Sequence, residues 1–140
     1  MRIQENKKTN KSNGISPKCK AIFEEINSLA PNLDLMKIRE NNGGRFAFWI
    51  SINDRMRNTK IEMLELSQRS SNCLHRAGYE TIGELVENIN SRDDLKKIRN
   101  CGEKSVNEIM EQLFCYQYSQ LGPERKMWYI GKLVEMNKVG

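Results

Sequence analysis

The chain has 140 residues, of which 38% are hydrophobic and 29% are charged. This length and this balance are typical of one soluble globular domain with extended ends. Because no run of about 18 apolar residues occurs, no segment is expected to span a membrane. The lysine-rich start lacks the apolar stretch of a secretory signal, so we expect a cytoplasmic, nucleoid-associated protein.

The formal net charge of +5 is placed unevenly. The first twenty residues hold six lysines and arginines against one glutamate, so this segment carries the whole net charge. Residues 1–14 have almost no apolar side chains, and we expect a disordered basic tail there. A basic tail on a neutral body indicates a polyanionic partner, although a merely solvated tail has the same composition.

Four cysteines occur, at Cys19, Cys73, Cys101 and Cys115, and none forms a C-x-x-C pair. We therefore expect reduced thiols. A zinc site formed by the last three cysteines and His75 is an alternative, but its spacing matches no usual zinc pattern. We expect no metal and no cofactor.

Residues 15–58 are predicted to form a helix followed by a small β-hairpin. Ser16 and Pro17 have the residue types of an N-cap and a first helical position, and Pro31 stops that helix. Two β-prone runs, 35–39 and 45–51, flank an Asn-Asn-Gly-Gly turn sequence, which predicts a hairpin over 35–51. Its aromatic side chains would pack on the core or on a partner, and the hairpin is a candidate homodimer contact.

Residues 59–121 carry four helix starts and are predicted to be all-α. Ser67, Thr81 and Ser91 are of the N-cap type, and the fourth helix follows Gly102. That fourth helix has one apolar stripe, made of Val106, Ile109, Met110, Leu113 and Phe114. Residues 122–140 are predicted to add a closing helix with Trp128 and Tyr129 in the core, and the alternative is that these two side chains face a partner.

The turn before the fourth helix is suited to binding a phosphate. A helix N-terminus presents unpaired N–H groups and partial positive charge, and Lys97, Lys104 and Ser105 lie near it in sequence. A P-loop is excluded because Lys97 occupies the position of its first glycine. On the helix after Ser67, four side chains share one face: Arg69, Asn72, Cys73 and Arg76. Such a face suits a narrow minor groove, but these residues alone favour an ordinary solvated face.

Residues 64–121 resemble the C-terminal domain of the bacterial RNA polymerase α subunit. The resemblance is carried by Leu64-Glu65-Leu66-Ser67-Gln68-Arg69-Ser70-Ser71-Asn72-Cys73-Leu74, Ile82-Gly83-Glu84-Leu85, Leu95-Lys96-Lys97-Ile98-Arg99-Asn100-Cys101-Gly102-Glu103-Lys104-Ser105 and Glu108-Ile109. It implies a compact bundle of four or five helices that ends in a helix-hairpin-helix. It also implies docking in the minor groove of A/T-rich DNA, with contacts to activators and sigma factor.

The family's DNA-facing positions fall here on Arg69, Asn72, Cys73, Lys97, Asn100, Gly102, Lys104, Ser105 and Glu108. We expect Glu108 to orient Arg69 by a charge-assisted hydrogen bond. We expect no counterpart of the α-subunit N-terminal domain, and the family's acidic patch is present only in part, as Glu62 and Glu65.

The sequence therefore predicts a mainly α, bacterial (or phage or mobile-element) DNA-binding protein that acts in transcription. Its expected parts are a basic tail (1–14), a helix plus hairpin (15–58), the DNA-binding module (59–121) and a closing helix (122–140). The alternative is an interaction module that mimics the polymerase domain to contact activators, sigma factor or polymerase. An enzyme is not expected, because His75 has no catalytic partner at motif spacing.

Overall fold

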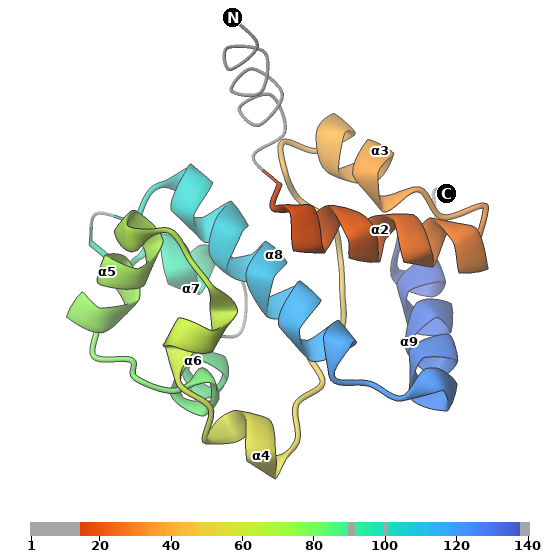
Figure 1. Cartoon of the computed structure of the whole chain (residues 1–140). Coiled ribbons are helices and arrows are strands. Elements are labelled where there is room, and N and C mark those ends of the chain that lie inside the picture. Colours follow the sequence, from red (N-terminus) through yellow and green to blue (C-terminus); the bar gives the residue numbers. More distant parts are fainter. Residues whose placement is uncertain (1–14, 90–91, 100, 138–140) are drawn as a thin grey trace, which may run out of the picture.

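The computed structural model describes residues 15–89, 92–99 and 101–137, and this part of the protein is mainly α with no β-strand (Figure 1). In chain order its elements are α2 (Pro17–Leu29), α3 (Leu35–Asn41), α4 (Asp54–Arg57), the 3-10 helix η1 (Ile61–Leu64), α5 (Gln68–Arg76), α6 (Ile82–Asn88), α7 (Arg92–Lys96), α8 (Glu103–Ser119) and α9 (Pro123–Met136). Among these described helices, none is long and apolar enough to cross a bilayer.

Local sequence signals set several of the helix starts as predicted. The hydroxyl of Ser16 accepts a hydrogen bond from the Cys19 N–H and opens α2, and Ser67 caps α5 in the same way through Ser70. Thr81 and Glu84 form the predicted capping box of α6. The predicted cap Ser91 and the predicted tail 1–14 lie outside the described residues.

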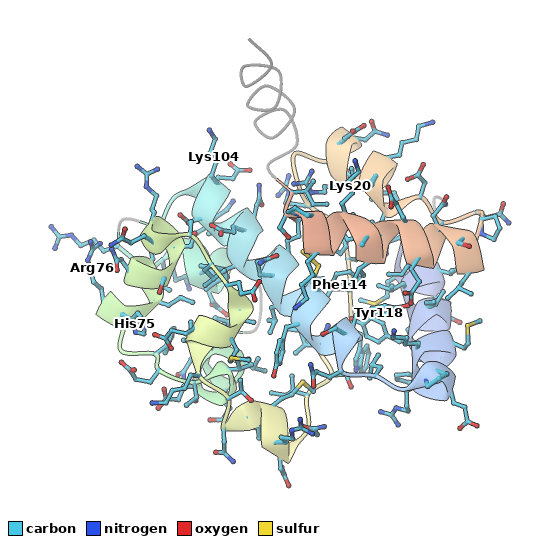
Figure 2. All side chains as sticks on the ribbon, in the orientation of Figure 1. Lys20, His75, Arg76, Lys104, Phe114 and Tyr118 are labelled. Atoms are coloured by element: carbon cyan, nitrogen blue, oxygen red, sulfur yellow. A yellow bond between two sulfur atoms is a disulfide. The ribbon has the colours of Figure 1, made fainter. Side chains whose placement is uncertain are left out.

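Helix α8 is the central element because its two halves belong to two hydrophobic clusters. Its first half contributes Val106, Ile109 and Leu113 to a mostly aliphatic cluster, which also contains buried residues of η1, α5, α6 and α7. Its second half contributes Phe114, Cys115 and Tyr118 to an aromatic cluster shared with α2, α3 and α9. Phe114 and Tyr118 accordingly lie between α8 and the α2/α9 side of the molecule (Figure 2).

The predicted hairpin over 35–51 is wrong. Residues 35–41 form helix α3, whose start is capped by the Asp34 carboxylate through the Lys37 N–H. The Gly-Gly pair does not turn a hairpin: Gly43 and Gly44 have φ of 66° and 90°, and the Gly44 N–H donates to the Arg39 carbonyl at the end of the helix. The run is β-prone in composition, but a helix cap and tertiary contacts decide its conformation.

Residues 45–51 are extended, yet side chains rather than a second strand bind their backbone. The Asn137 amide exchanges two hydrogen bonds with the backbone of Ala47, at 3.1 and 2.8 Å. The Gln117 amide accepts from the Ser51 N–H at 2.7 Å and donates to the Trp49 carbonyl at 2.9 Å. Because these partners lie 66 to 90 residues away in sequence, local composition could not reveal them.

Two further expectations are corrected. Trp128 is 47% exposed, whereas its neighbour Tyr129 is fully buried, so only one of the two aromatics joins the core. Cys19 and Cys115 are joined in a disulfide between α2 and α8, while Cys73 and Cys101 are buried and form no disulfide. The disulfide also takes Cys115 out of the zinc set considered above.

Candidate nucleic-acid interface

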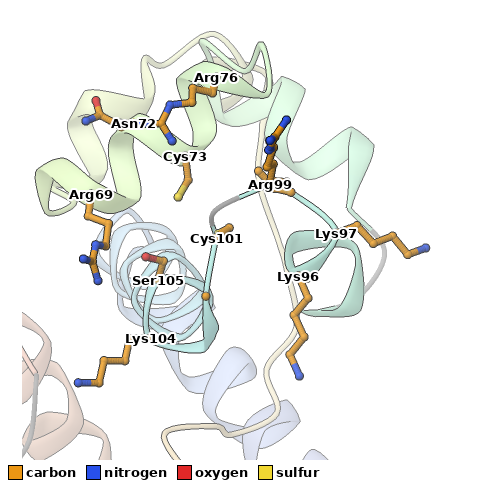
Figure 3. A pocket seen from close by; sticks show the side chains of 12 residues that line it. Arg69, Asn72, Cys73, Arg76, Lys96, Lys97, Arg99, Cys101, Lys104 and Ser105 are labelled. Carbon is orange, nitrogen blue, oxygen red and sulfur yellow. The ribbon is translucent and has the colours of Figure 1, made fainter.

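The main pocket of the described structure has a volume of about 880 Å³ and lies between α5, the end of α7 and the start of α8 (Figure 3). It is lined by Arg69, Asn72, Cys73, Arg76, Lys96, Lys97, Ile98, Arg99, Cys101, Gly102, Lys104 and Ser105. Three segments that are separate in sequence therefore form one surface.

The lining of this pocket is strongly basic. Six of its residues are lysines or arginines, and none is an aspartate or glutamate. Lys97 has an acidic neighbour in Asp94, at 3.8 Å and three residues earlier, but its own side chain is largely exposed. Since the sequence beyond residue 20 is neutral overall, this concentration of positive charge is a local feature that favours a polyanionic ligand.

Helix α5 supplies one wall of the pocket. Arg69, Asn72 and Arg76 are exposed on the same face of α5, while Cys73 and Leu74 are buried and anchor the helix in the aliphatic cluster. In Figure 3 the side chains of Arg69 and Asn72 extend from α5, and the guanidinium of Arg69 lies beside Ser105. The helix thus fixes the spacing of its two arginines while their side chains stay accessible.

Glu108 of α8 holds the start of α5. Its carboxylate accepts hydrogen bonds from the Ser67 N–H at 2.6 Å, the Ser67 hydroxyl at 2.8 Å and the Ser70 hydroxyl at 2.6 Å. The predicted bond from Arg69 to Glu108 is not formed, because the first turn of α5 occupies both carboxylate oxygens. Arg69 has no ion pair with any other described residue, so its guanidinium remains available to a ligand.

The start of α8 supplies the opposite wall. Gly102 is the N-cap, and this cap offers no side-chain acceptor, so the first N–H groups of a 17-residue helix are open to an anion. The φ of Gly102 is −77°, and a Cβ there would meet no described atom within 4 Å. The fold itself therefore does not require glycine at 102, and its small size leaves room for a ligand.

Two thiols lie at the base of the pocket. Cys73 is 1% exposed and Cys101 is 6% exposed. Burial, the electrostatic influence of the neighbouring Cys73 and a hydrogen bond with Cys73 raise the pKa of Cys101 to about 12. Cys101 is consequently a neutral thiol at physiological pH rather than a nucleophile.

The structure brings seven of the nine predicted site residues to this pocket. These are Arg69, Asn72, Cys73, Lys97, Gly102, Lys104 and Ser105. Glu108 lies behind α5 instead, and Asn100 lies outside the described residues. The predicted site omitted Arg76, Lys96 and Arg99. The sequence already places Arg76 on the same helix face as Arg69, and the Lys-Lys-Ile-Arg run is a visible signal for the other two.

A family comparison agrees with this geometry. Residues 51–114 match the model of the C-terminal domain of the bacterial RNA polymerase alpha chain. This part of the protein is therefore similar to an RNA polymerase α C-terminal domain. The matched region includes the whole pocket and ends at Phe114, in the middle of α8. Helices α2 and α3 and most of the extended segment precede the matched region, and α9 follows it.

Curated proteins that match include α subunits of DNA-directed RNA polymerase. That of Moorella thermoacetica is 47% identical over 60 residues, which cover 43% of this sequence and 18% of the subunit. That of Carboxydothermus hydrogenoformans is 34% identical over 92 residues, which cover 66% of this sequence and 26% of the subunit. That of Clostridium botulinum is 53% identical over 53 residues, which cover 38% of this sequence and 16% of the subunit. The match thus spans about a quarter or less of these relatives, and no solved structure matches significantly.

Proposed function

We propose that this protein binds double-stranded DNA in transcription by docking its α C-terminal domain in the minor groove of A/T-rich sites. The observation that carries the proposal is the pocket lined by six cations and no carboxylate. The minor groove of A/T-rich DNA is narrow and strongly negative, and it attracts arginine in particular. The family whose model matches this region provides independent support.

The predicted site residues take different roles in this proposal. Arg69 enters the groove from the α5 wall, and Asn72 and Asn100 hydrogen-bond to groove-edge acceptors. The N–H groups at the start of α8, with Gly102 and Ser105, hold one phosphate. Lys97 and Lys104 contact flanking phosphates. Cys73 forms part of the buried base of the pocket, and Glu108 acts indirectly by holding the first turn of α5.

We also propose a division of labour along the sequence. Residues 59–121 would be the DNA-binding module, 15–58 and 122–140 attachments to it, and 1–14 a basic tail that adds salt-dependent, sequence-independent affinity. No catalytic step is proposed for the whole protein.

The proposal is tested by fluorescence anisotropy with an A/T-rich duplex. Arg69→Ala is expected to weaken binding by about 1–3 kcal/mol, because the residue lines the pocket and has no ion-pair partner within the described fold. Arg55→Ala is the matched control: Arg55 is also exposed, but it lies on α4 outside the pocket. Equal affinities for wild type and Arg69→Ala would contradict the groove model.

A second candidate function is a protein-interaction module that contacts polymerase, sigma factor or an activator. The observation in its favour is Met63 of η1, which is 55% exposed between Glu62 and Glu65. An apolar side chain between two carboxylates is a suitable contact for a basic protein surface. A pull-down with purified polymerase and sigma factor, comparing wild type with Met63→Ala, distinguishes this function from DNA binding.

A further inference from the structure

The extended segment 45–51 has two different edges. The N–H and C=O groups that are hydrogen-bonded belong to odd-numbered residues, namely Ala47, Trp49 and Ser51. In an extended backbone, the groups of successive residues point to opposite edges. This edge therefore faces α8 and α9, because Gln117, Tyr129 and the C-cap residue Asn137 supply the partners.

The other edge is unpaired. No hydrogen bond among the described residues uses the backbone groups of Phe46, Phe48 or Ile50. Six groups, three N–H and three C=O, thus remain without a protein partner in the described structure, along one edge of an extended segment. A row of this kind is a template for a further strand.

The side chains along the segment alternate between packed and exposed, as expected for an extended backbone. Phe46 and Phe48 pack against the aromatic cluster and Ile50 against the aliphatic one. Ala47 and Trp49 are exposed, Trp49 to 51%. The segment thus has the apolar-in, exposed-out pattern of a half-buried strand, although no second strand is present in the described residues.

We propose that two copies of this protein pair antiparallel along this edge, with Phe48 opposite Phe48 of the second copy. All twelve free backbone groups then find partners in six hydrogen bonds, because 46 pairs with 50 and 48 with 48. The interface is self-complementary, as a two-fold contact requires. This proposal does not depend on the DNA-binding proposal.

The exposed side chains favour a second copy as the occupant of this edge. In the register centred on Phe48, each Trp49 lies opposite Ala47 of the other copy, so a large side chain meets a small one. Arg45 lies opposite Ser51, and no like charges oppose each other. Two-fold pairing would also place two cationic pockets in one dimer. Once one pocket is bound to DNA, the second pocket binds the same duplex more readily, because its effective concentration is higher.

The oligomeric state of the full-length protein tests the pairing. Sedimentation across a concentration series is expected to show a dimer for wild type and its loss for Trp49→Lys, because a lysine on an edge strand opposes pairing. Trp128→Lys is the matched control: it makes the same change at a tryptophan that is 47% exposed on α9, and its dimer is expected to persist. Circular dichroism checks that each variant is folded.

Amide hydrogen exchange gives a second readout that depends on the backbone alone. On raising the concentration of wild type, exchange at Phe46, Phe48 and Ile50 is expected to slow. Exchange at Ala47 and Ser51 is expected to stay slow throughout, since Asn137 and Gln117 already bind these N–H groups. A monomeric wild type, a dimer retained in Trp49→Lys, or a dimer lost equally in Trp128→Lys would overturn the proposal.

Discussion

The two hydrophobic clusters of this protein differ in chemistry although one helix serves both. The aliphatic cluster lies within the region that matches the polymerase domain, and capping side chains and short turns position its helices. The aromatic cluster joins segments from the two ends of the sequence through edge-to-face and tilted rings and a disulfide. Local sequence organises the first cluster, and long-range contacts organise the second.

Helix α8 makes these clusters interdependent. Its first turn borders the cationic pocket, and its second half lies among aromatic side chains. A buried ion pair between Arg39 of α3 and Glu111 of α8 lies near the middle of the helix. The segments outside the matched region therefore support the same helix that presents the pocket, and we expect the two clusters to unfold together.

The largest expected effect follows from Phe114→Ala. Phe114 is fully buried and contacts Phe46, Phe48 and Tyr118 among other rings, so its truncation is expected to cost about 3–5 kcal/mol of unfolding free energy. Urea unfolding is followed by tryptophan fluorescence, which reports on the aromatic side, and by circular dichroism, which reports on all helices.

A second variant, Leu113→Ala, tests the aliphatic cluster, to which this neighbour of Phe114 belongs. It is expected to cost about 2–5 kcal/mol of unfolding free energy. In both variants the fluorescence and circular-dichroism transitions should coincide, because α8 links the clusters. Separate transitions would show that the clusters are independent.

A smaller effect is expected from Glu108→Ala. It removes the acceptor of three hydrogen bonds at the start of α5 and should cost about 1–3 kcal/mol of stability. It should also weaken DNA binding less than Arg69→Ala, because it loosens the wall without removing a groove contact. Glu103→Ala controls for the lost negative charge, since Glu103 is exposed on the first turn of the same helix. Identical behaviour of the two variants would refute the capping role.

The smallest expected effect concerns the pKa of Glu25, whose carboxylate is bonded to Tyr118 of the aromatic cluster. The Tyr118 hydroxyl donates to Glu25 at 2.7 Å and, together with Lys126, holds the pKa of Glu25 below its ordinary value of 4.5. A lowered carboxylate pKa stabilises the fold above the ordinary value, and this stabilisation is lost as pH falls through the lowered pKa. Tyr118→Phe should raise the pKa of Glu25 in an NMR titration. The effect on stability is small because water screens this exposed carboxylate, and an unchanged pKa would contradict the assignment.

Much of the aliphatic side could be predicted from sequence because its signals are local. Ser67 and Thr81 are caps next to apolar residues at helical spacing, and the stripe on α8 identified its buried face. The same face analysis, with the family resemblance, brought Arg69 and Asn72 to the site. Lys96 and Arg99 belong to a visible basic run, but the run alone does not place them beside α5, because their position depends on how α7 packs on α8.

The aromatic side could not be predicted because its determinants are distant in sequence. The Cys19–Cys115 disulfide joins residues 96 positions apart. The segment after Gly44 looks like one strand of a hairpin, yet Gln117 and Asn137 take the place of the second strand. Asp34 is a recognisable N-cap in retrospect, but the β-prone residues that follow it outweighed that signal.

The most direct test of DNA binding by the cationic pocket is an NMR titration of the full-length protein with an A/T-rich duplex. We predict that the largest amide shifts fall on residues 69–76 and 96–105, and that a G/C-rich duplex produces weaker shifts at the same positions. The aromatic cluster should shift little. Shifts confined to the first twenty residues, with equal response to both duplexes, would show that the charged tail alone binds DNA and would contradict binding by the pocket.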